Sequence, residues 1–277
     1  MSADGYELID SGGGRKLERF GRYVLARPCA QAMWRPSLGA AEWARADASF
    51  DREDGNRWHG RGNLPKEWQI SAAGIRFRLG GTDFGHLGIF PEQIAQWQWI
   101  RESVSKAGRR PQVLNLFAYS GGSTMAAALG GAEVCHLDAS KGMVEWAREN
   151  AKMNGLGDAP IRWIVDDAHK FMKREIRRGR RYDAIVLDPP TFGRGAGGEM
   201  YKIERDLGET LGLVKSLLSD NPLFVLFSSH TPGLSVHVAE NVIGQLFPSA
   251  RIESGEMLLE GSSLSCPSGI YCRAVFG

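Results

Sequence analysis

The sequence has few cysteines, no long apolar run and no large excess of either charge. Its four cysteines lack CxxC or any other zinc-ligand spacing, and 277 residues can bury a full core without disulfide bonds. No apolar stretch approaches the ~20 residues that a membrane span needs, and the start "MSADGYELID" has no apolar signal core. These absences predict a soluble cytoplasmic protein with free thiols and no metal site.

The charge balance carries no global signature of nucleic-acid binding. The 34 Lys and Arg residues face 32 Asp and Glu residues, a net charge of +2, so any such binding would need a local basic face. One candidate is the polar segment 38–66 with four tryptophans in or near it: Trp34, Trp43, Trp58 and Trp68. The other is "KREIRRGRR", Lys173–Arg181, at the end of a predicted helix, where basic residues favour the helix dipole. For both segments we favour an ion-paired surface over an RNA-contacting face.

A GxGxxG dinucleotide fingerprint is also missing from the chain. Without it, the binding of a pyrophosphate-containing cofactor is poorly supported. A nicotinamide-dependent oxidoreductase is therefore the least favoured enzyme class.

The patterns that are present divide the chain into two parts. Up to about residue 83, glycines and prolines separate short alternating runs such as "GRYVLARP" and "IRFRLGG", which indicate a small, mostly antiparallel β module with one short helix in 38–50. From Pro91 onward, hydrophobic runs alternate with helical patterns, which predicts a parallel sheet covered by helices on both faces. We therefore expect an N-terminal β-rich domain at 1–83, a candidate for substrate recognition, and an α/β domain at 84–277 with a doubly wound, Rossmann-like sheet.

Sheets of this kind bind ligands at the carboxyl ends of their strands. The first strand is followed by Gly121-Gly122, where the backbone can approach a ligand closely, and the second by Asp138, which can accept hydrogen bonds from ribose hydroxyls. The third ends in Asp166 and Asp167, of which one is expected to cap the next helix and the other to contact an adenine amino group. We favour Asp167 as the ligand contact. Together these features suit a nucleoside without phosphates.

The motifs "VLNLFAYSGG", "HLDAS", "VDDA" and "VLDPPTFGRG", in this order, resemble the class I S-adenosylmethionine-dependent methyltransferases. Within them, the chain is most similar to the branch that modifies bases of large-subunit ribosomal RNA. The upstream "TDFGHLGIFPEQ" resembles that branch's GxFxxQ element, which leads into the cofactor domain. The resemblance covers about residues 75–232, and the N-terminal part matches more loosely, without the PUA domain of several relatives.

The resemblance implies S-adenosylmethionine as cofactor and RNA as the expected partner. Tyr119–Gly121 would line the methionine end of the cofactor, Asp138 would hold the ribose, and Asp167 with Ala168 would read the adenine. Asn115 stands where many class I enzymes have an acidic residue, and its amide oxygen can still accept from the ammonium group. The full implied cofactor set is Phe90, Gln93, Asn115, Phe117, Ala118, Tyr119, Ser120, Gly121, Asp138, Ala139, Ser140, Asp166, Asp167, Ala168 and Asp188.

The predicted fourth strand ends in Asp188 and then in two prolines, a stiff segment that can present acceptors to a flat substrate. The Asp188 carboxylate and the Pro189 carbonyl can accept hydrogen bonds from an exocyclic amine, and Phe192 can stack on the base. These three residues are the expected catalytic group. Further residues are expected to contact the substrate: Pro190, Thr191, Arg194, Ser229 and His230.

The end of the fifth strand bears on the atom that is methylated. Relatives that act on cytosine C5 carry a nucleophilic cysteine after an "FS" at this place, and this chain has Ser229 there. A hydroxyl is a far weaker nucleophile than a thiolate unless a base activates it. The predicted function is therefore methylation of a base nitrogen, in ribosomal RNA. The alternatives are a methyltransferase for a small molecule or a protein, and a non-catalytic RNA-binding or assembly module on the same fold.

Overall fold

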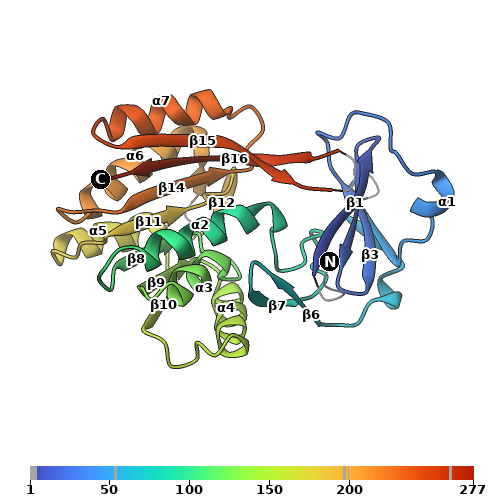
Figure 1. The fold of residues 1–277 in the computed structure, drawn as a ribbon, viewed down its shortest axis with the longest axis horizontal. Coiled ribbons are helices and arrows are strands. Elements are labelled where there is room, and N and C mark those ends of the chain that lie inside the picture. The colour runs from blue at the N-terminus through green and yellow to red at the C-terminus, as the bar shows by residue number, and fades with distance from the viewer. Residues whose placement is uncertain (1–4, 53–54, 196–197, 199, 262–263) are drawn as a thin grey trace. The chain divides into compact units, whose positions relative to one another are not determined.

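The structure is a computed structural model that describes residues 5–52, 55–195, 198, 200–261 and 264–277. The chain forms two compact units: Met1–Ile94 together with Met257–Ser268, and Ala95–Glu256 together with Gly269–Gly277 (Figure 1). The boundary expected after residue 83 falls inside the first unit. No described helix is long and apolar enough to cross a membrane.

The first unit is built from short strands. A five-stranded sheet contains, in spatial order, β1 (Tyr6–Gly12), β2 (Arg15–Phe20), β3 (Tyr23–Pro28), β4 (Ala48–Asp51) and β5 (Arg57–His59). A separate hairpin consists of β6 (Trp68–Ala72) and β7 (Ile75–Leu79), and two 3₁₀ turns lie at η1 (Arg61–Asn63) and η2 (Pro91–Gln93). Neighbouring strands are antiparallel except β3 and β4, which confirms the predicted β module. The helix expected over 38–50 is only α1 (Ala40–Trp43), because β4 pairs with β3 and buries Phe50.

The four tryptophans act as partly buried anchors in this unit. Each indole N–H donates a hydrogen bond to the chain: Trp34 to the Ser11 carbonyl, Trp43 to Asp10 Oδ2, Trp58 to the Thr82 carbonyl, and Trp68 to the Phe20 carbonyl. Buried indoles usually find such a partner. Their N–H groups are thus used within the fold, which supports the interpretation of this segment as an anchored surface.

The second unit contains a seven-stranded sheet with helices on both faces (Figure 1). Its strands, in spatial order, are β10 (Ile161–Val165), β9 (Glu133–Asp138), β8 (Gln112–Leu116), β11 (Ala184–Leu187), β14 (Phe224–Ser229), β16 (Cys266–Val275) and β15 (Arg251–Leu259). Its helices are α2 (Ile94–Ser105), α3 (Gly122–Leu129), α4 (Lys141–Met153), α5 (Ala168–Arg177), α6 (Ile203–Leu217) and α7 (Val236–Leu246). A small hairpin, β12 (Phe192–Arg194) and β13 (Met200–Lys202), precedes α6.

The sheet is mixed rather than parallel throughout, which corrects the expectation of a purely parallel sheet. The run from β10 through β14 is parallel, but β16 pairs antiparallel with β14, and β15 forms the edge beyond it. The segment 251–275 was not predicted as strand, because Pro267 and Gly269 interrupt its pattern. The strand order reverses between β8 and β11, and ligands bind at such a switch point in open α/β sheets.

Alternate residues of each central strand face the two helical layers. On one face, Leu114, Leu187 and Phe227 pack in a cluster with residues of α5, α6 and α7. On the other face, Trp99 of α2 contacts the Phe224 ring, and Asn115 bonds to Thr124 of α3. A buried sheet of this kind leaves only its strand ends and loops open to a ligand.

Candidate active site

Asp138, the last residue of β9, ties together three adjacent strand ends. Its Oδ2 accepts the backbone N–H of Tyr119 at 2.8 Å, and its Oδ1 accepts the backbone N–H of Ser140 at 2.8 Å. Its carbonyl accepts the N–H of Asp166 at the end of β10, at 3.2 Å. Burial raises the pKa of Asp138, opposed by the N–H donors of Ser140 and Tyr119. A carboxylate held this way has lone pairs left for further donors at the same strand end.

The loop between β8 and α3 has a strained backbone. Phe117 and Tyr119 have φ values of 55° and 49°, a left-handed conformation that non-glycine residues rarely adopt. Such strain is held by surrounding bonds and is frequent at ligand sites. Here the Ala118 N–H donates to the Leu137 carbonyl at 3.0 Å, and Asn150 Nδ2 donates to the Ser120 carbonyl at 2.9 Å.

Two glycines complete this loop. Gly121 has a φ of 89° and is the N-cap of α3, and a Cβ on it would lie 3.0 Å from the Ala147 methyl group. A Cβ on Gly122 would lie 2.5 Å from the Trp97 ring, so no larger residue fits there. The backbone can therefore turn tightly at the switch point of the sheet. With Asp138 oriented beside it, the loop fits the nucleoside and amino-acid ends of the cofactor expected from the sequence.

The two aspartates after β10 have different partners. Asp167 is the N-cap of α5 and accepts the Lys170 N–H through Oδ1, at 2.9 Å. Asp166 accepts the Asp167 N–H at 2.9 Å and forms an ion pair with Arg174. One of the two does cap the helix, as expected, and it is the residue that we favoured as the adenine contact. The cap uses one carboxylate oxygen, so a role for Asp167 in adenine binding stays a prediction.

Three buried polar side chains, one each from β8, α3 and β9, form a chain of hydrogen bonds. Asn115 Nδ2 donates to Thr124 Oγ1 at 2.9 Å, and Thr124 Oγ1 lies 2.8 Å from His136 Nδ1. The threonine hydroxyl thus connects the Asn115 amide to the His136 ring. This chain fixes the Asn115 amide with its nitrogen toward α3. The sequence did not reveal it, because β8, α3 and β9 come together only in the fold.

His136 makes folding sensitive to acid. Burial, with a smaller contribution from Arg148, lowers the pKa of His136 to about 3, whereas the unfolded chain binds the proton near pH 6.5. Stability from this residue is therefore complete above about pH 6.5 and falls as the pH drops toward 3. Between pH 7 and pH 5 we expect the free energy of unfolding to fall by about 2 kcal/mol from this residue alone.

Urea denaturation at the two pH values measures the effect. The variant His136→Gln should lose this part of the pH dependence, whereas His237→Gln, at an exposed position on α7, should keep it. An unchanged pH slope in His136→Gln would contradict the assignment.

The Pro-Pro segment after β11 is joined to the end of β14. His230 Nδ1 lies 3.5 Å from Asp188 Oδ1, and the hydroxyls of Thr191 and Thr231 lie 2.9 Å apart. The register of β11 with β8 pairs Leu187 with Leu116, so Asp188 follows beside the strained loop. Pro189 is buried and Pro190 exposed. The structure thus brings most of the expected catalytic and substrate residues to one edge of the sheet.

Phe192 and Ser229 differ strongly in exposure at this edge. Phe192, at the start of β12, is 50% exposed. Ser229 is 1% exposed, and its Oγ accepts the Thr231 N–H at 3.2 Å. Through this bond, the Ser229 hydroxyl stabilises the loop that follows β14.

Sequence reasoning missed an aromatic cluster beside the strained loop. The Tyr201 ring of β13 lies 5.4 Å from the Phe117 ring and 5.9 Å from the His169 ring, between centroids. Thr210 of α6 contacts two members of this cluster: its Oγ1 lies 2.7 Å from His169 Nε2 and 3.3 Å from the Tyr201 hydroxyl. Burial raises the pKa of Tyr201 to about 12, so the hydroxyl keeps its proton at neutral pH. The only signal was the position of Tyr201 at the end of the glycine-rich loop.

The remaining predicted residues lie at or beside the ends of η2, α4 and α5, and in β12. Phe90 and Gln93, in and beside η2, belong to the first unit. Ser140 is the N-cap of α4, accepting the Met143 N–H at 3.3 Å, with Ala139 just before it, and Ala168 opens α5. The side chain of Arg194 lies outside the part of the chain that the structure describes.

Three of the six basic residues in the segment Lys173–Arg181 form ion pairs: Lys173, Arg174 and Arg178. Lys173 pairs with Glu209 at 2.6 Å, and Arg174 pairs with Asp166. Glu175, fully buried, accepts from Arg162 at 2.8 Å and from the Tyr182 hydroxyl at 2.7 Å. These contacts support an ion-paired surface for this segment.

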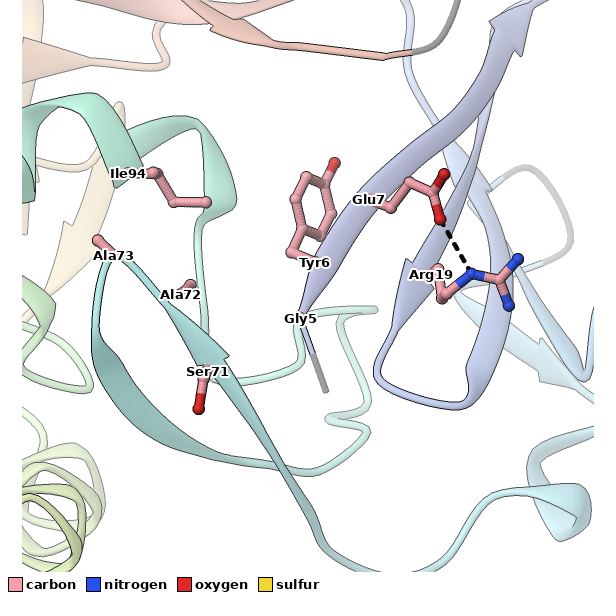
Figure 2. Close-up of a pocket in the computed structure, with 8 residues that line it drawn as sticks. All are labelled: Gly5, Tyr6, Glu7, Arg19, Ser71, Ala72, Ala73 and Ile94. Carbon is pink, nitrogen blue, oxygen red and sulfur yellow. Dashed lines mark hydrogen bonds and ion pairs between the residues drawn. The ribbon is translucent and has the colours of Figure 1, made fainter. Parts of the chain in front are cut away.

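A pocket of about 220 Å³ belongs to the first unit, whereas the strand ends belong to the second (Figure 2). It is lined by Gly5, Tyr6, Glu7, Arg19, Ser71, Ala72, Ala73 and Ile94. Glu7 and Arg19 on its wall neutralise each other in a 3.0 Å ion pair. Small side chains and a closed ion pair offer little for catalysis, so we derive the chemistry from the strand ends. The described residues contain no group of three or more His, Cys, Asp or Glu side chains that could hold a metal ion.

Comparison with known proteins agrees with this geometry. The family model described as S-adenosylmethionine-dependent methyltransferase matches residues 24–221. The crystal structure of a SAM-dependent methyltransferase from Agrobacterium tumefaciens is 38% identical, with a TM-score of 0.93 over 99% of this chain and 91% of that one. A Streptococcus mutans protein described as a SAM-dependent methyltransferase shares the fold at 19% identity, with a TM-score of 0.76 over 99% of this chain and 76% of that one.

Curated relatives match a shorter region. The ribosomal RNA large subunit methyltransferase K/L of Shewanella frigidimarina is 35% identical over 150 residues, which is 53% of this chain and 20% of that protein. The protein of the same name from Magnetococcus marinus is 30% identical over 177 residues, 63% of this chain and 23% of that protein. The chain spans about a fifth of the length of these relatives. Since the family model covers most of the chain and the Agrobacterium enzyme aligns along nearly all of it, the chain belongs to the S-adenosylmethionine-dependent methyltransferases.

Proposed function

We propose that this methyltransferase transfers a methyl group to a nitrogen of an RNA base, with ribosomal RNA as the substrate. The observation that carries the proposal is the end of β11. There the Asp188 carboxylate, the buried Pro189 and the exposed Phe192 ring follow one another beside the loop between β8 and α3. The curated relatives that share this region are named for ribosomal RNA methylation, which supports the choice of substrate.

In this reaction the protein mainly has to align the accepting nitrogen with the methyl group of the cofactor. S-adenosylmethionine supplies a methyl group that is already electrophilic. An amine attached to an aromatic ring is a poor nucleophile, because its lone pair is delocalised into the ring. When the amine donates its N–H groups to Asp188 and to the Pro189 carbonyl, its lone pair turns toward the methyl group. The same hydrogen bonds hold the nitrogen at reacting distance.

The residues around Asp188 can bind the RNA base and accept the proton that the amine loses. Phe192, being half exposed, can stack on the base, a contact worth about 1–3 kcal/mol. One proton must leave the nitrogen for each methyl group gained, and Asp188 and His230, whose Oδ1 and Nδ1 atoms lie 3.5 Å apart, are two groups that can accept it. A base in a duplex has to flip out to enter such a site, so single-stranded or looped RNA is the preferred substrate.

The cofactor residues follow from the loop geometry. We propose that Asp138 binds the ribose hydroxyls, that Tyr119–Gly121 lies along the methionine end, and that Asn115 accepts from its ammonium group. The bond from Asn115 Nδ2 to Thr124 turns the amide oxygen away from α3 and supports this orientation.

Transfer of labelled methyl groups tests the substrate. Purified protein and labelled S-adenosylmethionine are incubated with ribosomal RNA from cells that lack the gene, with total protein and with a metabolite extract. We expect label in the RNA fraction, and nucleoside mass spectrometry to find a methyl group on a base nitrogen. Label in protein or metabolites alone supports the small-molecule or protein alternative. Cofactor binding without transfer to any fraction indicates a non-catalytic module.

A further inference from the structure

Two of the four cysteines lie side by side in the first unit. Cys29 follows β3 and Cys266 opens β16, 237 positions later, and their Sγ atoms are 3.1 Å apart. Cys29 is partly exposed, whereas Cys266 is fully buried in a small apolar cluster with Leu8, Ala32 and Leu259. Cys29 is therefore the more accessible residue of the pair.

The surroundings of this pair favour ionisation of the exposed thiol. A hydrogen bond from Cys266 lowers the pKa of Cys29 to about 6, with further contributions from the Lys16 charge and from the backbone N–H groups of Ala32 and Gln31. Its bond to Cys29 raises the pKa of Cys266, and so does burial. The negative charge of Glu18, which lies 3.2 Å from Lys16, also raises the pKa of Cys266. These interactions favour ionisation of Cys29 over that of Cys266.

The other two cysteines provide a contrast within the same protein. Burial raises the pKa of Cys135 to about 11 and that of Cys272 to about 12. Both side chains are buried. Thiols of this kind are inert toward oxidants, so any selective oxidation should begin at Cys29.

We propose that Cys29 and Cys266 form a redox-active pair that hydroperoxides convert to a disulfide. The Cys29 thiolate attacks one peroxide oxygen, the O–O bond breaks, and hydroxide leaves from hydrogen peroxide, giving a sulfenic acid at Cys29. The Cys266 sulfur then attacks the Cys29 sulfur, the S–O bond breaks, and water leaves. Two electrons pass from the two thiols to the peroxide, and the overall products are one disulfide and two water molecules.

The bond would join the end of β3 to the start of β16. From Cys266, β16 runs on to Ile270, which pairs with Ser229 at the end of β14. The disulfide would therefore restrain the first residue of β16, the strand that pairs with β14 up to Ser229. The inference rests on the first unit and does not depend on the proposed RNA substrate.

Peptide mapping tests the pair directly. The full-length protein, kept dilute, is treated with hydrogen peroxide at pH 7, alkylated, and digested without reduction. We expect a cross-linked peptide containing Cys29 and Cys266. Cys266→Ser should leave Cys29 as a sulfenic acid that dimedone captures, and Cys29→Ser should give neither product. The matched control Cys272→Ser should form the same cross-link as the wild type.

A second measurement needs no variant. The rate of Cys29 alkylation in the wild-type protein should rise with a midpoint near pH 6, against about 8.5 for an ordinary thiol. A midpoint near 8.5 would overturn the proposal. So would a peroxide-treated protein in which Cys29 is oxidised but linked to a second chain, or carried to sulfinic acid without any Cys29–Cys266 bond.

Discussion

Asp188→Ala is expected to lower kcat for methyl transfer by about 10²- to 10⁴-fold, the range typical of losing a group that aligns and deprotonates a nucleophile. The carboxylate sits at the end of β11, with its Oδ1 3.5 Å from His230. The affinity for S-adenosylmethionine should change little, because the loop that is proposed to hold the cofactor is fixed by Asp138. Single-turnover methyl transfer and calorimetry with the cofactor measure the two quantities separately.

A second substitution divides the role of Asp188 into its parts. Asp188→Asn keeps one acceptor oxygen for the amine N–H but cannot take up a proton at neutral pH. Activity near that of the wild type would assign the residue to alignment, whereas loss equal to Asp188→Ala would assign it to proton removal. Asp158→Ala, at an exposed position between α4 and β10, is the matched control and should keep full activity. Equal loss of cofactor affinity and turnover in Asp188→Ala would contradict the proposed substrate role.

Asp138→Ala should weaken the binding of S-adenosylmethionine by about 100-fold. A hydrogen bond to a charged group contributes about 1.5–3 kcal/mol, and about 1.4 kcal/mol corresponds to a factor of ten. The substitution removes the acceptor proposed for the ribose and also releases the N–H groups of Tyr119 and Ser140. Isothermal titration gives the dissociation constant, and turnover at saturating cofactor should recover in part.

The thermal stability of the cofactor-free protein separates the two consequences of losing Asp138. Asp138→Asn retains one acceptor, so it should preserve one of the two backbone bonds and lose less affinity. A variant that is as stable as the wild type but binds weakly supports direct contact with the ribose. Unchanged affinity in a folded Asp138→Ala protein would rule out that contact.

The strand ends of the second unit were predictable, because local chemistry marks them. Gly121 carries a positive φ that glycine tolerates best, and Asp138 and Asp188 are acidic residues directly after hydrophobic runs. Short-range patterns of this kind persist in the fold, since the central strands β8, β9, β11 and β14 are buried on both faces, whereas Asp138 and Asp188 at their ends are partly exposed. The sequence therefore indicated the edge of the sheet where the site lies.

The remaining features depend on residues distant in the sequence. Tyr201 meets Phe117 and His169 only through the β12–β13 hairpin, and Thr124 meets His136 only across α3 and β9. The antiparallel edge was missed because β16 begins with a Cys-Pro-Ser-Gly stretch, which looks like a turn. In each case tertiary packing decides the outcome, and local propensity gives no sign of it.

The composition of the first unit has a consequence for synthesis on the ribosome. This unit contains Met1–Ile94, yet it also includes Met257–Ser268, which are translated only after the whole of Ala95–Glu256. Leu8 forms a parallel bridge with Gly261 and packs against Leu259 and Cys266. A nascent chain that has emerged only to β14 therefore leaves the apolar side of β1 uncovered. The first unit can therefore be completed only when Met257–Ser268 has emerged, and removal of that segment should disrupt the unit that begins with β1.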